Sequence, residues 1–240
     1  MEGHRHPLLE SLPAAMKYYI YISDAKVDML FPQVPHDIKK KVATEWKMDL
    51  KLLSASRRVE TESEDNRIAR LETVVEFIRR YGNLGSIEQP DQFVEDILPM
   101  RWGPLGDGDI QLVYFAGKVD HTVVGLGGSM KHVIGSSLKG GCGMSAEPTL
   151  ALEEIFAREG KNEIRDSLAS DDRESERDAF ELVLEATRST LGPLQLVDFM
   201  AKRLMFWNGD VWPGESDNER NRLSGTRILL ATPLYVALVD

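Results

Sequence analysis

A short segment near the start of the chain, residues 23–28, carries side chains that can bind hydroxyl groups, orient an amine or hold a cation. Asp24, Lys26 and Asp28 alternate in it with alanine and valine. The segment directly follows residues 17–23, whose aromatic and β-branched side chains predict a buried strand. Loops at the ends of rigid strands often carry binding groups. The structural alternative is a turn cap at Asp24 and a surface pair between Lys26 and Asp28.

A second segment, residues 127–132, combines glycines with hydrogen-bond donors. Its candidate ligand-binding residues are Gly127, Gly128, Ser129, Lys131 and His132. Glycines let backbone N–H groups approach an anion closely, and the serine, lysine and histidine add donors or positive charge. The structural alternative is a glycine bulge in a twisted strand, followed by a half-buried histidine. If the two segments meet, we expect one anion-binding site.

The same residues allow a catalytic interpretation. His132 is a candidate general base and Asp24 its candidate acidic partner, which requires the two segments to lie side by side. Known catalytic and phosphate-binding motifs do not match: Ser129 lacks the G-x-S-x-G context of a nucleophile elbow, and Met130 stands where a dinucleotide fingerprint has its third glycine. Gly141 stands where a Walker motif needs lysine.

Composition excludes several classes of function. The 240 residues carry a net charge of −10, which disfavours bulk binding of nucleic acid. The single cysteine, Cys142, excludes an intramolecular disulfide, and five histidines without a ligand motif indicate no metal site. No apolar run reaches the roughly 20 residues of a membrane helix. We expect a cytoplasmic protein, and the sequence does not identify a cofactor.

Apolar periodicity predicts the helices. One begins near Pro35 and buries Ile38, Val42, Trp46, Leu50 and Leu53. A second follows a polar linker at 60–65, buries Ile68, Leu71, Val75 and Ile78, and ends at Gly82. Further helices are expected over 148–159, 176–191 and 194–207, with a short one near 93–98.

Alternating or continuous apolar runs predict strands over 17–23, 110–116, 121–126 and 227–239, the third of which can continue through the glycines toward Ile134. Pro233 predicts two short strands or an edge position with a bulge. Residues 24–35, 85–108 and 161–177 are expected to be loops. Because strands are adjacent as often as they alternate with helices, we expect an α+β fold: a mixed, mainly antiparallel sheet packed with about five helices. The alternative is a doubly wound α/β fold.

Three stretches resemble a known family: YYIYISDAKVDMLFPQVP, GLGGSMKHVIG and TPLYVAL. The family is bacterial, largely actinobacterial, and known only as a domain of unknown function. The resemblance implies one globular domain over 16–240, after a flexible leader at 1–15, and supplies no activity or site residues.

Three functions follow from these observations. The first is a binding module for an anionic small molecule such as a nucleotide, in a sensor or effector of a bacterial signalling or defence operon. The second is a hydrolase or transferase using His132. The third is a protein-interaction subunit or homo-oligomer that docks a protein partner on acidic faces and a C-terminal edge strand.

Overall fold

The computed structural model describes residues 17–42, 61–106, 112–135, 148, 151–152, 154–155, 173–209 and 225–239, with the backbone alone for 61–65 and 173–178. Several sequence predictions lie outside these residues: the leader, the helix positions Trp46, Leu50 and Leu53, Cys142, and residues 161–172 of the loop expected over 161–177. The remaining residues of that expected loop, 173–177, are helical and belong to α6 (Arg173–Ser189).

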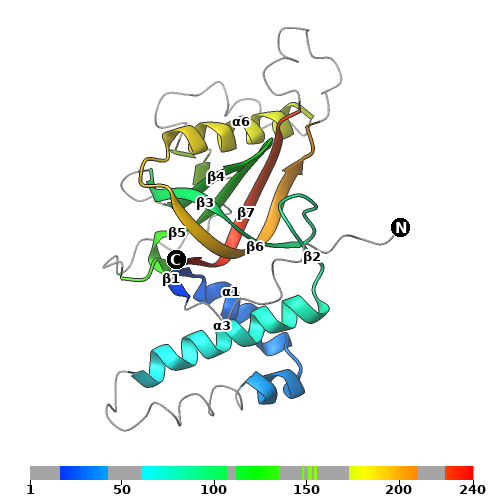
Figure 1. Cartoon of the computed structure of the whole chain (residues 1–240), viewed down its shortest axis with the longest axis vertical. Coiled ribbons are helices and arrows are strands. Elements are labelled where there is room, and N and C mark those ends of the chain that lie inside the picture. Colours follow the sequence, from blue (N-terminus) through cyan, green and yellow to red (C-terminus); the bar gives the residue numbers. More distant parts are fainter. Residues whose placement is uncertain are drawn as a thin grey trace.

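Five strands form a closed barrel (Figure 1). They are β3 (Phe93–Leu105), β4 (Leu112–Val119), β5 (Thr122–Ser129), β6 (Gln195–Trp207) and β7 (Arg227–Leu238). The circuit runs β7–β5–β4–β3–β6 and returns to β7. Two shorter strands extend the sheet: β1 (Tyr18–Ile22) pairs antiparallel with β7, and β2 (Leu84–Gly85) pairs parallel with β3.

The α+β class and the mainly antiparallel sheet are confirmed. Only the β2–β3 and β5–β7 pairings are parallel among the described strands, which excludes a doubly wound fold. The sheet differs from a simple open sheet because β6 closes it by pairing with both β3 and β7.

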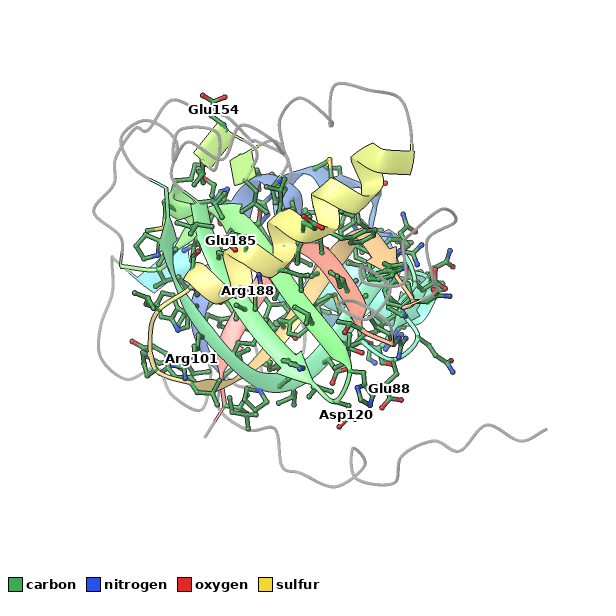
Figure 2. All side chains as sticks on the ribbon, turned by 90° about the horizontal axis from the view of Figure 1, so that it is seen from above. Glu88, Arg101, Asp120, Glu154, Glu185 and Arg188 are labelled. Carbon is green, nitrogen blue, oxygen red and sulfur yellow. The ribbon has the colours of Figure 1, made fainter. Side chains whose placement is uncertain are left out.

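Side chains alternate between the barrel interior and its outer surface. The interior cluster includes Val94, Leu98, Phe115, Leu126, Phe199 and Val236. Outside, helix α6 (Arg173–Ser189) packs on β4, β5 and β7. Figure 2 shows α6 lying across these strands, with Glu185 and Arg188, 3.7 Å apart, on the helix.

A second group of helices packs at the other end of the molecule, below the barrel in Figure 1. It consists of α1 (Asp24–Leu30), the 3-10 turn η1 (Phe31–Gln33), the helical residues 36–42 and α3 (Thr61–Tyr81). Ile38, Val42, Leu71, Val75 and Ile78 are buried in this group, as their spacing predicts.

Several local predictions are wrong. The expected loop over 24–35 contains α1 and η1. Pro32 does not prevent this, because it occupies the first turn of η1, where its missing N–H costs nothing. The polar linker at 60–65 belongs to α3 from Thr61 onward. The expected loop over 85–108, with its short helix, contains the 13-residue strand β3. The expected helix over 194–207 is β6.

The error at β6 arises from competing signals. Leucine, methionine, lysine and arginine favour a helix in isolation, yet Val197, Phe199 and Ala201 alternate toward the barrel interior. Burial against the other strands therefore overrides helix propensity.

Strand β7 is a single strand in the middle of the sheet. It pairs with β6 along one side, and with β5 and then β1 along the other. The predicted C-terminal edge strand is therefore wrong, whereas the predicted bulge is present: the register with β6 shifts between Met200 and Ala201, opposite Pro233.

Candidate functional site

Strand β1 brings the two polar segments of the sequence together. Tyr21 forms a β-bridge with Val133, and the Ile134 N–H donates to the carbonyl of Ile20 over 2.9 Å. On one side of the junction, β1 is followed by α1. On the other side, residues 133–134 follow β5 through the 3-10 turn η2 (Met130–His132). Residues 23–28 and 127–132 are therefore spatial neighbours.

Asp24 and His132 face each other across this junction. The distance from His132 Nδ1 to Asp24 Oδ2 is 3.6 Å, and His132 is buried. Arg67 of α3 binds both carboxylate oxygens of Asp24, at 2.6 and 2.9 Å, and donates to the Ile22 carbonyl. Burial alone would raise the pKa of Asp24, but the hydrogen bonds and positive charges of His132 and Arg67 lower it overall. Asp24 therefore faces the imidazole as a carboxylate.

A cavity of about 430 Å³ opens beside this pair. Its walls come from α1, the end of β5, η2, β6, β7 and Pro148. The positively charged or basic lining residues are Lys26, Lys131, Lys202 and His132. The hydroxyl-bearing ones are Tyr21, Ser23, Ser129 and Thr232, and the apolar ones are Ala25, Met29, Pro148 and Leu204. Gly128 completes the described lining, which contains no carboxylate.

Lys26 lies in the wall of this cavity. Its ammonium nitrogen Nζ is 3.3 Å from Ser23 Oγ and 3.1 Å from the Pro233 carbonyl oxygen. Burial, and secondarily the nearby charge of Lys202, lower the pKa of Lys26 to about 8. A substantial fraction of this lysine is therefore neutral near physiological pH.

The phenol of Tyr21 reaches the same lining residues from the barrel interior. Its ring packs edge-to-face on Phe115 and on His132. Its hydroxyl lies so close to Gly128 that a Cβ there would be 2.4 Å from the oxygen. Burial raises the pKa of Tyr21, although the Ser23 side chain and the Ser129 backbone act against this. Among the described residues, however, no group makes a hydrogen bond of normal geometry with this buried hydroxyl.

The structure places most of the predicted site residues at the cavity. Lys26, Gly128, Ser129, Lys131 and His132 line it, and Asp24 stands behind His132. Two predicted residues lie elsewhere: Asp28 pairs with Arg70 of α3 at 2.7 Å, and Gly127 lies against Pro148, where an added Cβ would be 2.5 Å from the proline ring.

Sequence reasoning missed Tyr21, Lys202 and Thr232. Tyr21 is indistinguishable from a core residue in its apolar strand. Lys202 falls in a segment predicted to be a helix, and Thr232 in one predicted to be an edge strand. Lys202 and Thr232 become neighbours through the β6–β7 pairing that closes the barrel, and Tyr21 joins them through the pairing of β1 with β7 and the bridge to Val133. A single sequence carries no local signal for either contact.

A second, wider hollow of about 560 Å³ lies beside β2. Its lining mixes Glu88 and Asp91 with Arg203 and Phe206, and the Arg203 guanidinium already donates to the Pro90 carbonyl over 2.8 Å. This mixed charge gives no preference for a ligand class.

Two kinds of feature are absent from the described part of the chain. No group of three or more histidine, cysteine or carboxylate side chains is placed there to hold a metal ion. None of the helices found there combines the length and apolar character needed to cross a lipid bilayer.

Comparison with known proteins gives one match. Residues 17–240 match a family described as a family of unknown function (DUF7019). Neither a curated protein nor a solved structure matches the chain.

Proposed function

Since the chain belongs to this family of unknown function, we propose its function from the cavity itself: the protein binds a small anionic molecule between α1, η2 and β6. The observation that carries the proposal is the charge of the lining. Lys26, Lys131 and Lys202 gather there with His132 and with no described carboxylate, in a chain whose net charge is −10. A local excess of cations on an acidic protein attracts anions to that place.

The size and the remaining walls of the cavity support a small molecule. A volume of about 430 Å³ lies within the range of roughly 300–1,000 Å³ that is usual for ligand sites. Met29, Pro148 and Leu204 supply apolar surface, and the serine and threonine hydroxyls supply hydrogen bonds. A phosphorylated or carboxylated compound with a compact apolar part satisfies both kinds of wall, and a mononucleotide is one example.

A thermal-shift screen with mononucleotides, cyclic nucleotides, sugar phosphates and short carboxylic acids tests the proposal. A ligand present at a hundred times its dissociation constant stabilises the folded state by about 2.7 kcal/mol, or several degrees in a domain of this size. The shift should fall strongly in Lys131→Ala and persist in Lys118→Ala, which removes the same charge from an exposed position on β4. Equal shifts in the two variants would refute this site.

The Asp24–His132 contact favours a second candidate, a hydrolase or transferase in which His132 acts as general base. The imidazole lines the cavity, and Asp24 lies 3.6 Å behind it, an arrangement that orients a base toward a substrate. Turnover of a bound ligand, lost in His132→Gln while binding persists, would favour the enzyme. Stable binding without turnover would favour the binding module.

A further inference from the structure

The hydrogen-bond partners of the Lys26 amine are of a kind that anion binding alone does not require. Its two acceptors are the Ser23 hydroxyl and the Pro233 carbonyl, both uncharged. Among the described residues it forms no ion pair with a carboxylate. A half-buried lysine without a counter-ion is costly when protonated and less so when neutral.

A neutral amine fits this environment better than an ammonium ion. It has two N–H bonds, which the two acceptors can receive, and one lone pair that remains available for reaction. Lys202 in the same cavity wall adds a positive charge that disfavours protonation. With a pKa of about 8, roughly a quarter of Lys26 is neutral at pH 7.5, against about a thousandth of an ordinary lysine. Desolvation beside another cation is one way in which proteins activate a nucleophilic lysine.

We propose that Lys26 forms an imine with the carbonyl group of an anionic aldehyde or 2-keto acid bound in this cavity. The inference rests on the proposed function, because Lys131, Lys202 and His132 hold the anionic group and so place the carbonyl near Nζ. It adds a reactive residue and a substrate class to that function.

The reaction balances without an oxidant or reductant. The Nζ lone pair attacks the carbonyl carbon and forms a C–N bond, while the electrons of the carbonyl π bond move to oxygen. Proton transfer from nitrogen to that oxygen gives a carbinolamine. Protonation of its hydroxyl, loss of water and loss of the remaining N–H proton then give the imine. His132, in the same lining and 3.6 Å from Asp24, can carry these protons.

Pyridoxal 5′-phosphate, an anionic aldehyde of suitable size, serves as the probe. The full chain is incubated with about one equivalent, reduced with cyanoborohydride and mapped by peptide mass spectrometry. We expect about tenfold more reduced adduct at Lys26 than at exposed Lys118, because far more of Lys26 is neutral. Lys26→Arg, which keeps the positive charge, should abolish that adduct. Adducts spread evenly over the lysines of the wild-type chain would overturn the proposal.

The pH dependence of labelling gives a second readout. The rate of adduct formation at Lys26 should rise with a midpoint near pH 8, and Lys202→Ala should move this midpoint upward because a like charge is removed. A midpoint above pH 10 in the wild-type protein would contradict the inference.

Pyridoxine 5′-phosphate, which has an alcohol in place of the aldehyde, separates this inference from the proposed function. If it binds and Lys131→Ala weakens its binding, but the aldehyde leaves no adduct at Lys26, the anion site stands and the imine is rejected. If neither phosphate binds and no Lys26 adduct forms, both proposals fail for this class of ligand. Binding together with a Lys26 adduct supports both.

Discussion

At the scale of single residues, the hydroxyl of Tyr21 shows most directly that the cavity can receive a ligand. A buried hydroxyl without a partner costs about 1–3 kcal/mol relative to one that is satisfied. Ser23, Gly128 and Ser129 surround it and also line the cavity. A ligand oxygen, or a water molecule between ligand and protein, would complete its hydrogen bonding.

We therefore expect Tyr21→Phe to leave the free energy of unfolding of the ligand-free protein unchanged, or to raise it by up to about 2 kcal/mol. The same substitution should weaken the binding of an anionic ligand about tenfold, the loss of one hydrogen bond. Chemical denaturation and calorimetric titration measure the two effects. A loss of stability above about 1 kcal/mol in the ligand-free protein would show that the hydroxyl is already satisfied.

Lys26 makes stability depend on pH in a definite direction. Its pKa in the folded protein is about 8, below the 10.5 of an ordinary lysine side chain. Between these values the unfolded chain binds more protons than the folded one, so stability rises as pH increases from about 8 to above 10. Below pH 8 both states are protonated, and the cost of burying the charge is fully present.

Comparison with Lys26→Met isolates this contribution. The stability of the variant relative to wild type should be greatest below pH 8 and should fall by on the order of 1–3 kcal/mol between pH 8 and pH 10.5. Urea denaturation across this range measures the difference. A constant difference would show that the pKa of Lys26 is not lowered by folding.

At the scale of elements, three prolines lie where a strand has only one neighbour. β3 pairs with β6 over Phe93–Met100 and with β4 over Met100–Leu105, so Pro99 and Pro104 each have a single partner strand. In β7, the pairing with β5 ends at Ala231 and that with β1 begins at Tyr235, which leaves Pro233 paired with β6 alone. A missing N–H is tolerated at such positions.

Pro233→Ala should therefore change the free energy of unfolding by less than about 1 kcal/mol. Ala231→Pro, two residues earlier, should cost about 3 kcal/mol or more, because Ala231 pairs with Leu126 on one side and Arg203 on the other. Thermal denaturation of the two variants tests this contrast. Similar losses in both would show that Pro233 does not mark a singly paired position.

The parts of the fold that the sequence predicts are those encoded by local patterns. The buried stripes of α3 and the strands β1, β4 and β5 are local patterns, and their predicted positions agree with the structure. Strand β3 was not predicted. Pro99 and Pro104 are compatible with it only because β3 changes its partner strand between them, and that change is not visible in the sequence. The clustering of Lys26, Lys131 and His132 was predicted only on condition that two segments meet. That condition depends on the contact between β1 and residues 133–134, the bridge from Tyr21 to Val133 and the hydrogen bond from Ile134 to Ile20.

At the scale of the whole molecule, a partly buried polar network connects β3, β6, β7, the residue before β1, and α3. Asp198 of β6 binds Lys17 at 2.8 Å and accepts a hydrogen bond from Tyr235 of β7 at 2.8 Å. The Tyr235 hydroxyl is also 3.3 Å from Glu95 of β3, which pairs with Arg79 of α3. Lys17 directly precedes β1, so the network holds that strand against the barrel.

Asp198→Asn should lower the free energy of unfolding by roughly 2–4 kcal/mol, since it leaves a partly buried lysine without its charge partner. Asp28→Asn is the matched control: its ion pair with Arg70 is largely exposed and should contribute less than about 1 kcal/mol. Equilibrium denaturation in urea compares the two. Equal losses would mean that the network adds nothing beyond a surface ion pair.

The position of β7 has a consequence for how the protein is made. This strand, Arg227–Leu238, pairs with β1, β5 and β6, so the edges of these strands that face it stay unpaired until it has left the ribosome. Until β7 has been synthesised, the nascent chain exposes apolar strand edges, a state in which pairing with other chains competes with folding. The barrel and its cavity therefore close only after β7 has joined the strands made before it, and the exposure of these edges ends with that step.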